Sequence, residues 1–207
     1  MPLIRRDAPA PSADRDAPVA GTVPSLTAEA SEDRRAAARQ LVVTAETRDA
    51  TAIALFHEND AHVLQALFTA LVRSSNSTSV EIALELLRSD DARLRTGALD
   101  ALKAMTAHVL PHMAQLLSDA DTDVRILACD LARAQPPEAI VDLLGPVLET
   151  DGDGNVCGAA IEVMADVATP EHVPLLLRCA ERFPADPFLA FSARTAAQRI
   201  GARNGKP

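Results

Sequence analysis

The chain has 207 residues and a net charge of −9, and it contains no Trp or Tyr. A nucleic-acid-binding protein neutralises phosphates with a basic face and stacks bases on aromatic rings, so we expect no nucleic-acid partner. Apolar residues make up 48% of the chain and aromatic residues only 2%, which favours closely packed helices over β-sandwiches and barrels. No stretch approaches the ~20 apolar residues of a membrane span, and no signal peptide is evident, so we expect no membrane partner.

Residues 1–26 are rich in Pro, Ala and Asp. This composition predicts a disordered N-terminal tail, because such a segment cannot bury enough apolar surface to offset its ordering entropy. The alternative is a tether or docking peptide, whose adhesive part would be Leu3, Ile4, Arg5 and Arg6.

From residue 27 onward the chain repeats itself. Five apolar positions recur 30 to 33 residues apart, and each is followed four residues later by another apolar, mostly small residue. This spacing places both on one helix face, where a small residue lets a neighbouring helix approach closely. The five anchors are Val63, Leu94, Val124, Val156 and Leu189, and the residues that follow them are Leu67, Ala98, Ala128, Ala160 and Ala193.

A second apolar helical stretch precedes each anchor, so every period is predicted to hold two helices, A and then B, joined by an acidic turn. The A stretches are residues 51–56, 80–87, 109–117, 139–148 and 173–180. Asp and Ser in the turns are typical helix N-caps. A further helix over 32–43 is expected in an irregular first unit. The last unit should end at Gly201, which predicts a repeat domain over 27–202 and a frayed C-terminus over 203–207.

The runs Asp121-Thr122-Asp123-Val124-Arg125 and Asp91-Ala92-Arg93-Leu94-Arg95 resemble the second helix of HEAT repeats. More narrowly, they resemble the short bacterial type named after phycobiliprotein lyase subunits. The resemblance covers about residues 45–200. It implies an all-α fold, a right-handed α-solenoid of five to six helical hairpins whose B helices line the concave face. The Arg appears in two units, while Leu64, Cys157 and Ala190 replace it elsewhere.

Two motifs imitate metal sites. Asp151, Asp153 and Asn155 with Glu162 at the twelfth place resemble a calcium loop, but Val156 stands where the loop needs Gly and fits the repeat as an anchor. An ordinary A–B turn is therefore the preferred interpretation. His108 and His112 have the spacing of two ligands on one helix face, yet Pro111 predicts the first turn of a helix there, with His108 at or before its cap. We expect no metal and no cofactor.

The three cysteines, Cys129, Cys157 and Cys179, are an odd number without CxxC spacing and lie in apolar helical patterns. This arrangement predicts free core thiols in a reducing cytoplasm. No nucleophile or phosphate-loop motif is present, so we expect a non-enzymatic protein.

One row of B-helix residues is not explained by packing. Six positions after each anchor come Thr69, Asp100, Asp130, Glu162 and Thr195, and basic residues lie nearby. This row is either an internal ladder of ion pairs or a polar groove for a basic or mixed-charge partner segment. The candidate partner-binding residues are Arg95, Asp100, Lys103, Arg125, Asp130, Arg133 and Glu162.

The sequence therefore predicts a scaffold or adaptor that binds another protein along its B helices, with no small-molecule substrate. The alternative from the enzyme class, suggested by the family's namesake, is a bilin lyase-like subunit; a chaperone is a further alternative. A HEAT-like DNA glycosylase would need a basic groove, which the charge of −9 argues against.

Overall fold

The computed structural model describes residues 25–204, and all its regular structure over that range is helical. The predicted tail over 1–26 lies outside this range except for Ser25 and Leu26, as do residues 205–207. No helix of the described part is long and apolar enough to cross a membrane. The helices are α1 (Ser31–Gln40), α2 (Arg48–His57), α3 (Ala61–Ser74), α4 (Ser77–Leu86), α5 (Ala92–Ala104), α6 (Thr106–Val109), η1 (Leu110–His112), α7 (Met113–Leu117), α8 (Thr122–Ala132), α9 (Pro137–Thr150), α10 (Gly154–Val167), η2 (Pro170–His172), α11 (Val173–Glu181) and α12 (Pro187–Asn204).

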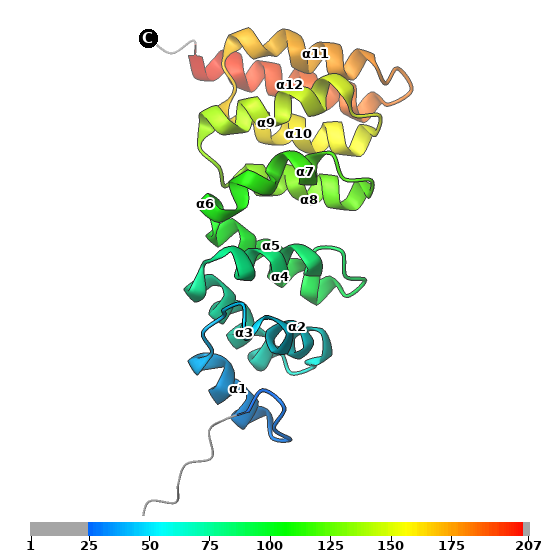
Figure 1. Ribbon diagram of the computed structural model, residues 1–207. Helices are drawn as coiled ribbons and strands as arrows, with labels where there is room; N and C mark the ends of the chain where they lie inside the picture. Colours follow the sequence, from blue (N-terminus) through cyan, green and yellow to red (C-terminus); the bar gives the residue numbers. More distant parts are fainter. Residues whose placement is uncertain (1–24, 205–207) are drawn as a thin grey trace, which may run out of the picture.

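The helices form a two-layered stack, as Figure 1 shows. Helices α3, α5, α8, α10 and α12 pack on one another in order and form the B layer. Helices α2, α4, α6–α7, α9 and α11 do the same in the A layer. Helix α1 packs on α3 and therefore belongs to the B layer. The predicted solenoid of five to six helical hairpins is confirmed, with five A–B pairs behind an irregular first helix. Its right-handed course and concave B face stay predictions.

The predicted anchors form the centre of the core. All five are at most 3% exposed, and the residues four positions later are fully buried. Four of these partners are Ala, whose small side chain lets consecutive B helices pack closely. Burying these apolar side chains between neighbours is what stabilises each hairpin, because a single hairpin cannot bury its own apolar face.

Aspartates cap the B helices at each turn. Asp60 accepts from the backbone N–H groups of His62 (2.8 Å) and Val63 (3.1 Å), and these two hydrogen bonds lower the pKa of its carboxyl. Equivalent caps come from Asp91, Asp121, Asp153 and Asp186. The predicted acidic turns are therefore helix N-caps, and each fixes where a B helix begins.

Two local predictions were wrong. The third A helix begins at Thr106 and not near Pro111, so His108 lies within α6; Pro111 instead falls in the 3₁₀ segment that separates α6 from α7, where its missing N–H breaks the helix. Helix α12 runs past Gly201 to Asn204, because Arg203 donates to the carbonyl oxygens of Ala165 (3.0 Å) and Asp166 (2.6 Å).

Candidate functional site

Arg125, one of the predicted partner-binding residues, locks a turn. Its guanidinium donates to the carbonyl oxygen of Asp119, six residues earlier (2.9 Å), and pairs with both carboxylate oxygens of Asp151 in the next unit (Nε to Oδ2 2.8 Å, Nη2 to Oδ1 3.3 Å). The two side chains are only 15% and 7% exposed. Arg95 makes the same backward contact, donating to the carbonyl oxygen of Ser89 (2.7 Å). Arg125 therefore joins two consecutive turns, whereas Arg95 closes only its own turn. Both guanidinium groups are engaged by the protein itself and are poorly placed to meet a partner.

The same turn lock recurs at Arg34, which the sequence analysis missed. Arg34 donates to the carbonyl oxygen of Ala28, again six residues earlier (2.9 Å), and pairs with Glu58 in the next turn (Nε to Oε2 2.7 Å). The hydrogen bonds from Arg34 lower the pKa of Glu58 to about 2. The repeat therefore extends back into α1. The signal was an Arg 30 residues before Leu64, hidden because Asp33 stands at the apolar anchor position.

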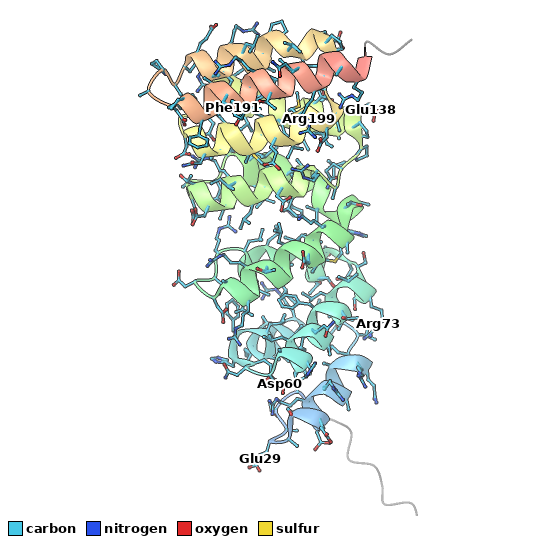
Figure 2. All side chains as sticks on the ribbon, turned by 180° about the vertical axis from the view of Figure 1, so that it is seen from behind. Glu29, Asp60, Arg73, Glu138, Phe191 and Arg199 are labelled. Atoms are coloured by element: carbon cyan, nitrogen blue, oxygen red, sulfur yellow. The ribbon has the colours of Figure 1, made fainter. Side chains whose placement is uncertain are left out.

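Most of the predicted acidic row forms ion pairs that cross from one B helix to the next. Lys103 Nζ lies 2.7 Å from Asp130 Oδ2, and Arg133 lies 2.7 Å from Asp166 and 3.3 Å from Glu162. Figure 2 shows this face of the stack, with Arg199 on α12 at its far end. We call this set the B-face ladder; its members are Lys103, Asp130, Arg133, Glu162, Asp166 and Arg199.

Asp100 differs from its neighbours in the row. It is exposed, and within residues 25–204 it makes no ion pair, whereas Asp130 and Glu162 both do. The structure therefore divides the seven predicted residues into three groups. Arg95 and Arg125 lock turns, Asp100 is left unpaired, and the other four belong to the B-face ladder.

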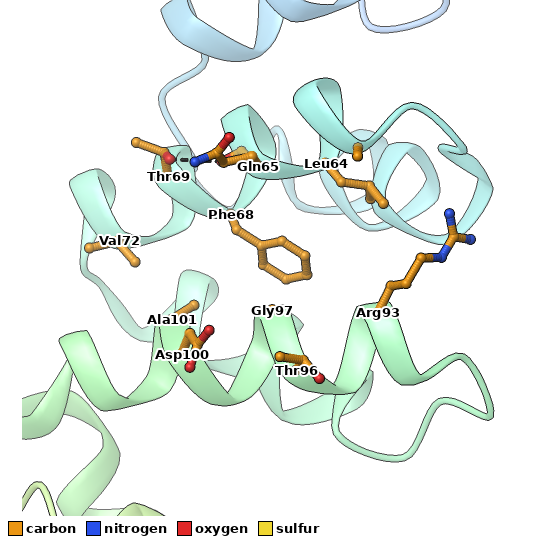
Figure 3. A pocket seen from close by; sticks show the side chains of 11 residues that line it. Leu64, Gln65, Phe68, Thr69, Val72, Arg93, Thr96, Gly97, Asp100 and Ala101 are labelled. Carbon is orange, nitrogen blue, oxygen red and sulfur yellow. Dashed lines mark hydrogen bonds between the residues drawn. The ribbon is translucent and has the colours of Figure 1, made fainter.

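Asp100 lies at the edge of a groove between α3 and α5, which we call the α3–α5 groove (Figure 3). The groove has a volume of about 460 Å³ and is mainly apolar. The ring of Phe68 points from α3 toward Gly97 on α5, as Figure 3 shows. A Cβ atom at Gly97 would come within 2.2 Å of this ring, so only glycine leaves room for it. The other lining residues are Ala61, Leu64, Gln65, Thr69, Val72, Arg93, Thr96 and Ala101.

A second, smaller hollow of about 260 Å³ lies next to the α3–α5 groove, between α1 and α3. Its arginines, Arg35, Arg39 and Arg73, have no carboxylate within ion-pair distance in the part of the chain that the structure describes. Arg73 instead donates to the carbonyl oxygen of Leu41. We call this cavity, with its three arginines, the basic hollow. The B face thus carries an unpaired basic region beside a groove with an unpaired carboxylate.

The apparent metal motifs have structural roles. Asp153 caps α10 through the N–H groups of Asn155 and Val156, Asp151 pairs with Arg125, and Glu162 lies inside α10. The interpretation as an A–B turn is confirmed. Between residues 25 and 204 no group of three or more His, Cys, Asp or Glu side chains is arranged to hold a metal ion.

All three cysteines are free and buried, which confirms that they are core thiols. Burial raises the pKa of Cys129 to about 12. A hydrogen bond with the neighbouring Cys179 thiol, together with burial, raises the pKa of Cys157. Both thiols therefore stay protonated at neutral pH, which makes them poor nucleophiles.

Comparison with known proteins agrees with this architecture. Residues 110–196 match the family model described as HEAT repeats. This part of the chain is similar to HEAT repeats. The match spans the units from α7 to α12, which include the Asp121–Arg125 run and its turn lock. A search of curated proteins gave no match.

Several solved structures are similar to the chain. Two are engineered proteins of the Northeast Structural Genomics Consortium, each 20% identical to it; the alignments cover 87% of this chain and 95% or 97% of theirs, with TM-scores of 0.43 and 0.42. A designed armadillo repeat protein is 16% identical over 84% of this chain and 96% of its own, with a TM-score of 0.41.

Proposed function

We propose that this HEAT-like protein is a non-enzymatic interaction module of the cytoplasm that binds a partner protein through the α3–α5 groove. HEAT-like repeats suggest a protein-interaction scaffold, because stacking creates an extended surface without special loops. The observation that carries the proposal is Asp100. It is the one acidic member of the row left without an ion pair among the described residues, and it borders an apolar groove.

The chemistry of the groove defines the partner segment. Phe68, Leu64 and Val72 offer an apolar floor, which favours one or two aliphatic side chains. The carboxylate of Asp100 favours a Lys or Arg beside them. Burying one aliphatic side chain contributes about 1.5–3 kcal/mol, and an exposed ion pair contributes up to about 1 kcal/mol. A short segment should therefore bind weakly, and a tight complex would need further contacts along the B layer.

The B-face ladder is a less suitable site. Each of its charges already has an opposite charge within 3.8 Å, so a charged partner would have to compete with existing ion pairs. The bilin-lyase alternative gains no support either, since the groove is lined by one aromatic ring, Phe68, and by no thiol.

Affinity capture from the native host with charge-reversed variants tests the proposal. Asp100→Lys places a positive charge where a basic partner residue would bind. Glu149→Lys is the matched control, because Glu149 is exposed on α9 in the A layer and has no ion pair among residues 25–204. We expect a partner, identified by mass spectrometry, that the wild type and Glu149→Lys retain and Asp100→Lys loses. A partner captured equally by all three proteins, or none that recurs, would contradict the proposal.

A further inference from the structure

Two neighbouring regions of the B face, the basic hollow and the α3–α5 groove, favour ligands of opposite charge. The basic hollow between α1 and α3 presents unpaired arginines and favours carboxylates. The α3–α5 groove, one helix further along the stack, favours an aliphatic side chain next to a cation. A single segment that fits both must carry acidic residues first and an aliphatic–basic run some distance beyond them.

The chain itself contains such a segment. Residues 1–24 lie outside the described range and lead into Ser25, six residues before the start of α1. Going back from Ser25, the first charged residues are Asp16, Arg15 and Asp14. Asp7 comes next, and the aliphatic–basic run of Leu3 to Arg6 lies directly before it. Residues 14–16 carry a net charge of −1 and residues 5–7 a net charge of +1, so the order of net charges along this segment matches the order of the two regions on the B face.

The lengths also agree. Packed helices lie about 8–10 Å apart, so α5 is roughly 20 Å from α1 across α3. The eighteen residues 7–24 can span at most about 60 Å. The segment is therefore longer than Arg6 needs to reach Asp100. Asp14 and Asp16 lie between Arg6 and Ser25 in the sequence, so they can lie over the basic hollow.

Another hollow, beside α2, suits this segment less well. It has a volume of about 780 Å³ and is lined by Leu26 and by α2 residues such as Ile53. Both of its carboxylates are engaged: Glu58 pairs with Arg34, and Asp60 caps α3. No free carboxylate remains among its lining residues to hold Arg5 or Arg6.

We propose that the chain's own N-terminal segment occupies the B face, with Leu3 and Ile4 in the α3–α5 groove, Arg5 or Arg6 on Asp100, and Asp14 and Asp16 over the basic hollow. The segment then covers the surface proposed above for a partner, and a partner must displace it. This inference rests on the proposed function only for that consequence. The contact between the N-terminal segment and the B face can be tested without any partner.

Nuclear magnetic resonance of the full chain tests the contact directly. The chain has only five Phe and no other aromatic residue except His, so the ring signals of Phe68 can be separated. We expect a nuclear Overhauser effect between an Ile4 methyl group and the Phe68 ring. It should disappear in Asp100→Lys and also in Arg5→Glu/Arg6→Glu, a change that cannot disturb the core of the stack. An Ile4 methyl at the shift of a free peptide, or a contact that survives both charge reversals, would overturn the proposal.

A second measurement separates this inference from the proposed function. An intramolecular segment acts at an effective concentration of about 1 mM; if it binds with a dissociation constant of about 0.1 mM, it weakens partner binding about tenfold. Leu3→Ser/Ile4→Ser should therefore raise partner affinity about tenfold. If the Ile4–Phe68 contact is present but no partner depends on Asp100, the proposed function fails alone. If a partner depends on Asp100 but the serine variant binds it no better, the N-terminal segment does not cover the site.

Discussion

Removing the charge of Asp151 should destabilise the protein far more than removing the charge of Asp130. Both carboxylates pair with a basic side chain of another unit, but the Asp151 side chain is 7% exposed and that of Asp130 is 40% exposed. In Asp151→Asn the amide can still accept one hydrogen bond, yet Arg125, whose side chain is only 15% exposed, loses its paired carboxylate and keeps only the weaker influence of Asp153 and Asp119. Breaking a buried pair costs about 3–5 kcal/mol, so with this residual hydrogen bond we expect about 2–3 kcal/mol. An exposed pair contributes about 0.2–1 kcal/mol.

Thermal and urea unfolding of the two variants measure this difference. For a chain of this size, 1 kcal/mol shifts Tm by about 2–4 °C. We expect Tm to fall by about 5–10 °C in Asp151→Asn and by less than about 4 °C in Asp130→Asn. In 1 M salt the small effect of Asp130→Asn should shrink further, because screening acts on exposed charges. Equal shifts in the two variants, or a loss below 2 °C in Asp151→Asn, would refute the assignment of Arg125 and Asp151 as a turn lock.

Three further predictions concern other parts of the stack. Gly97→Ala should push the Phe68 ring out of the α3–α5 groove and abolish partner capture while changing Tm by less than about 3 °C, because alanine's higher helix propensity offsets part of the clash; unchanged capture would contradict the role of the groove. Glu58, whose pKa is lowered to about 2, should contribute stability that is present above pH ~4.5 and lost as the pH falls toward 2; Glu58→Gln should flatten the urea-unfolding free energy over that range. Native protein should leave all three thiols, Cys129 included, unreacted with a thiol reagent until denaturant is added, and fast labelling of any one would show that the core opens.

The helical stack could be predicted from the sequence because each unit repeats the same physical requirements. An apolar anchor such as Val124, a small residue such as Ala128 and a capping aspartate such as Asp121 specify one helix face and one helix start. These requirements are local, so they appear at a fixed spacing. The wrong predictions arose where a distant contact decides the outcome. Helix α12 extends to Asn204 because Arg203 bonds to carbonyl groups 37 and 38 residues earlier in the chain, a pairing that no local pattern shows.

The candidate site was only partly predictable for the same reason. The row of Asp100, Asp130 and Glu162 follows from helical spacing, but which members are paired depends on side chains of the next unit. Lys103 reaches Asp130 and not Asp100. The groove beside Asp100 depends on Phe68 lying opposite Gly97 across two helices. A rare aromatic residue facing a mid-helix glycine one unit later is a signal that the sequence contains, although only the known pairing of α3 with α5 gives it meaning.

The α3–α5 groove is formed by one junction between consecutive B helices. In a stack whose units contact only their neighbours, duplication or loss of a unit beyond α8 alters the length of the protein and leaves this junction as it is. Length and recognition can therefore vary independently during evolution. A descendant with more or fewer repeat units would bind the same segment in the α3–α5 groove. Only the distance between that segment and the C-terminal end of the stack would change.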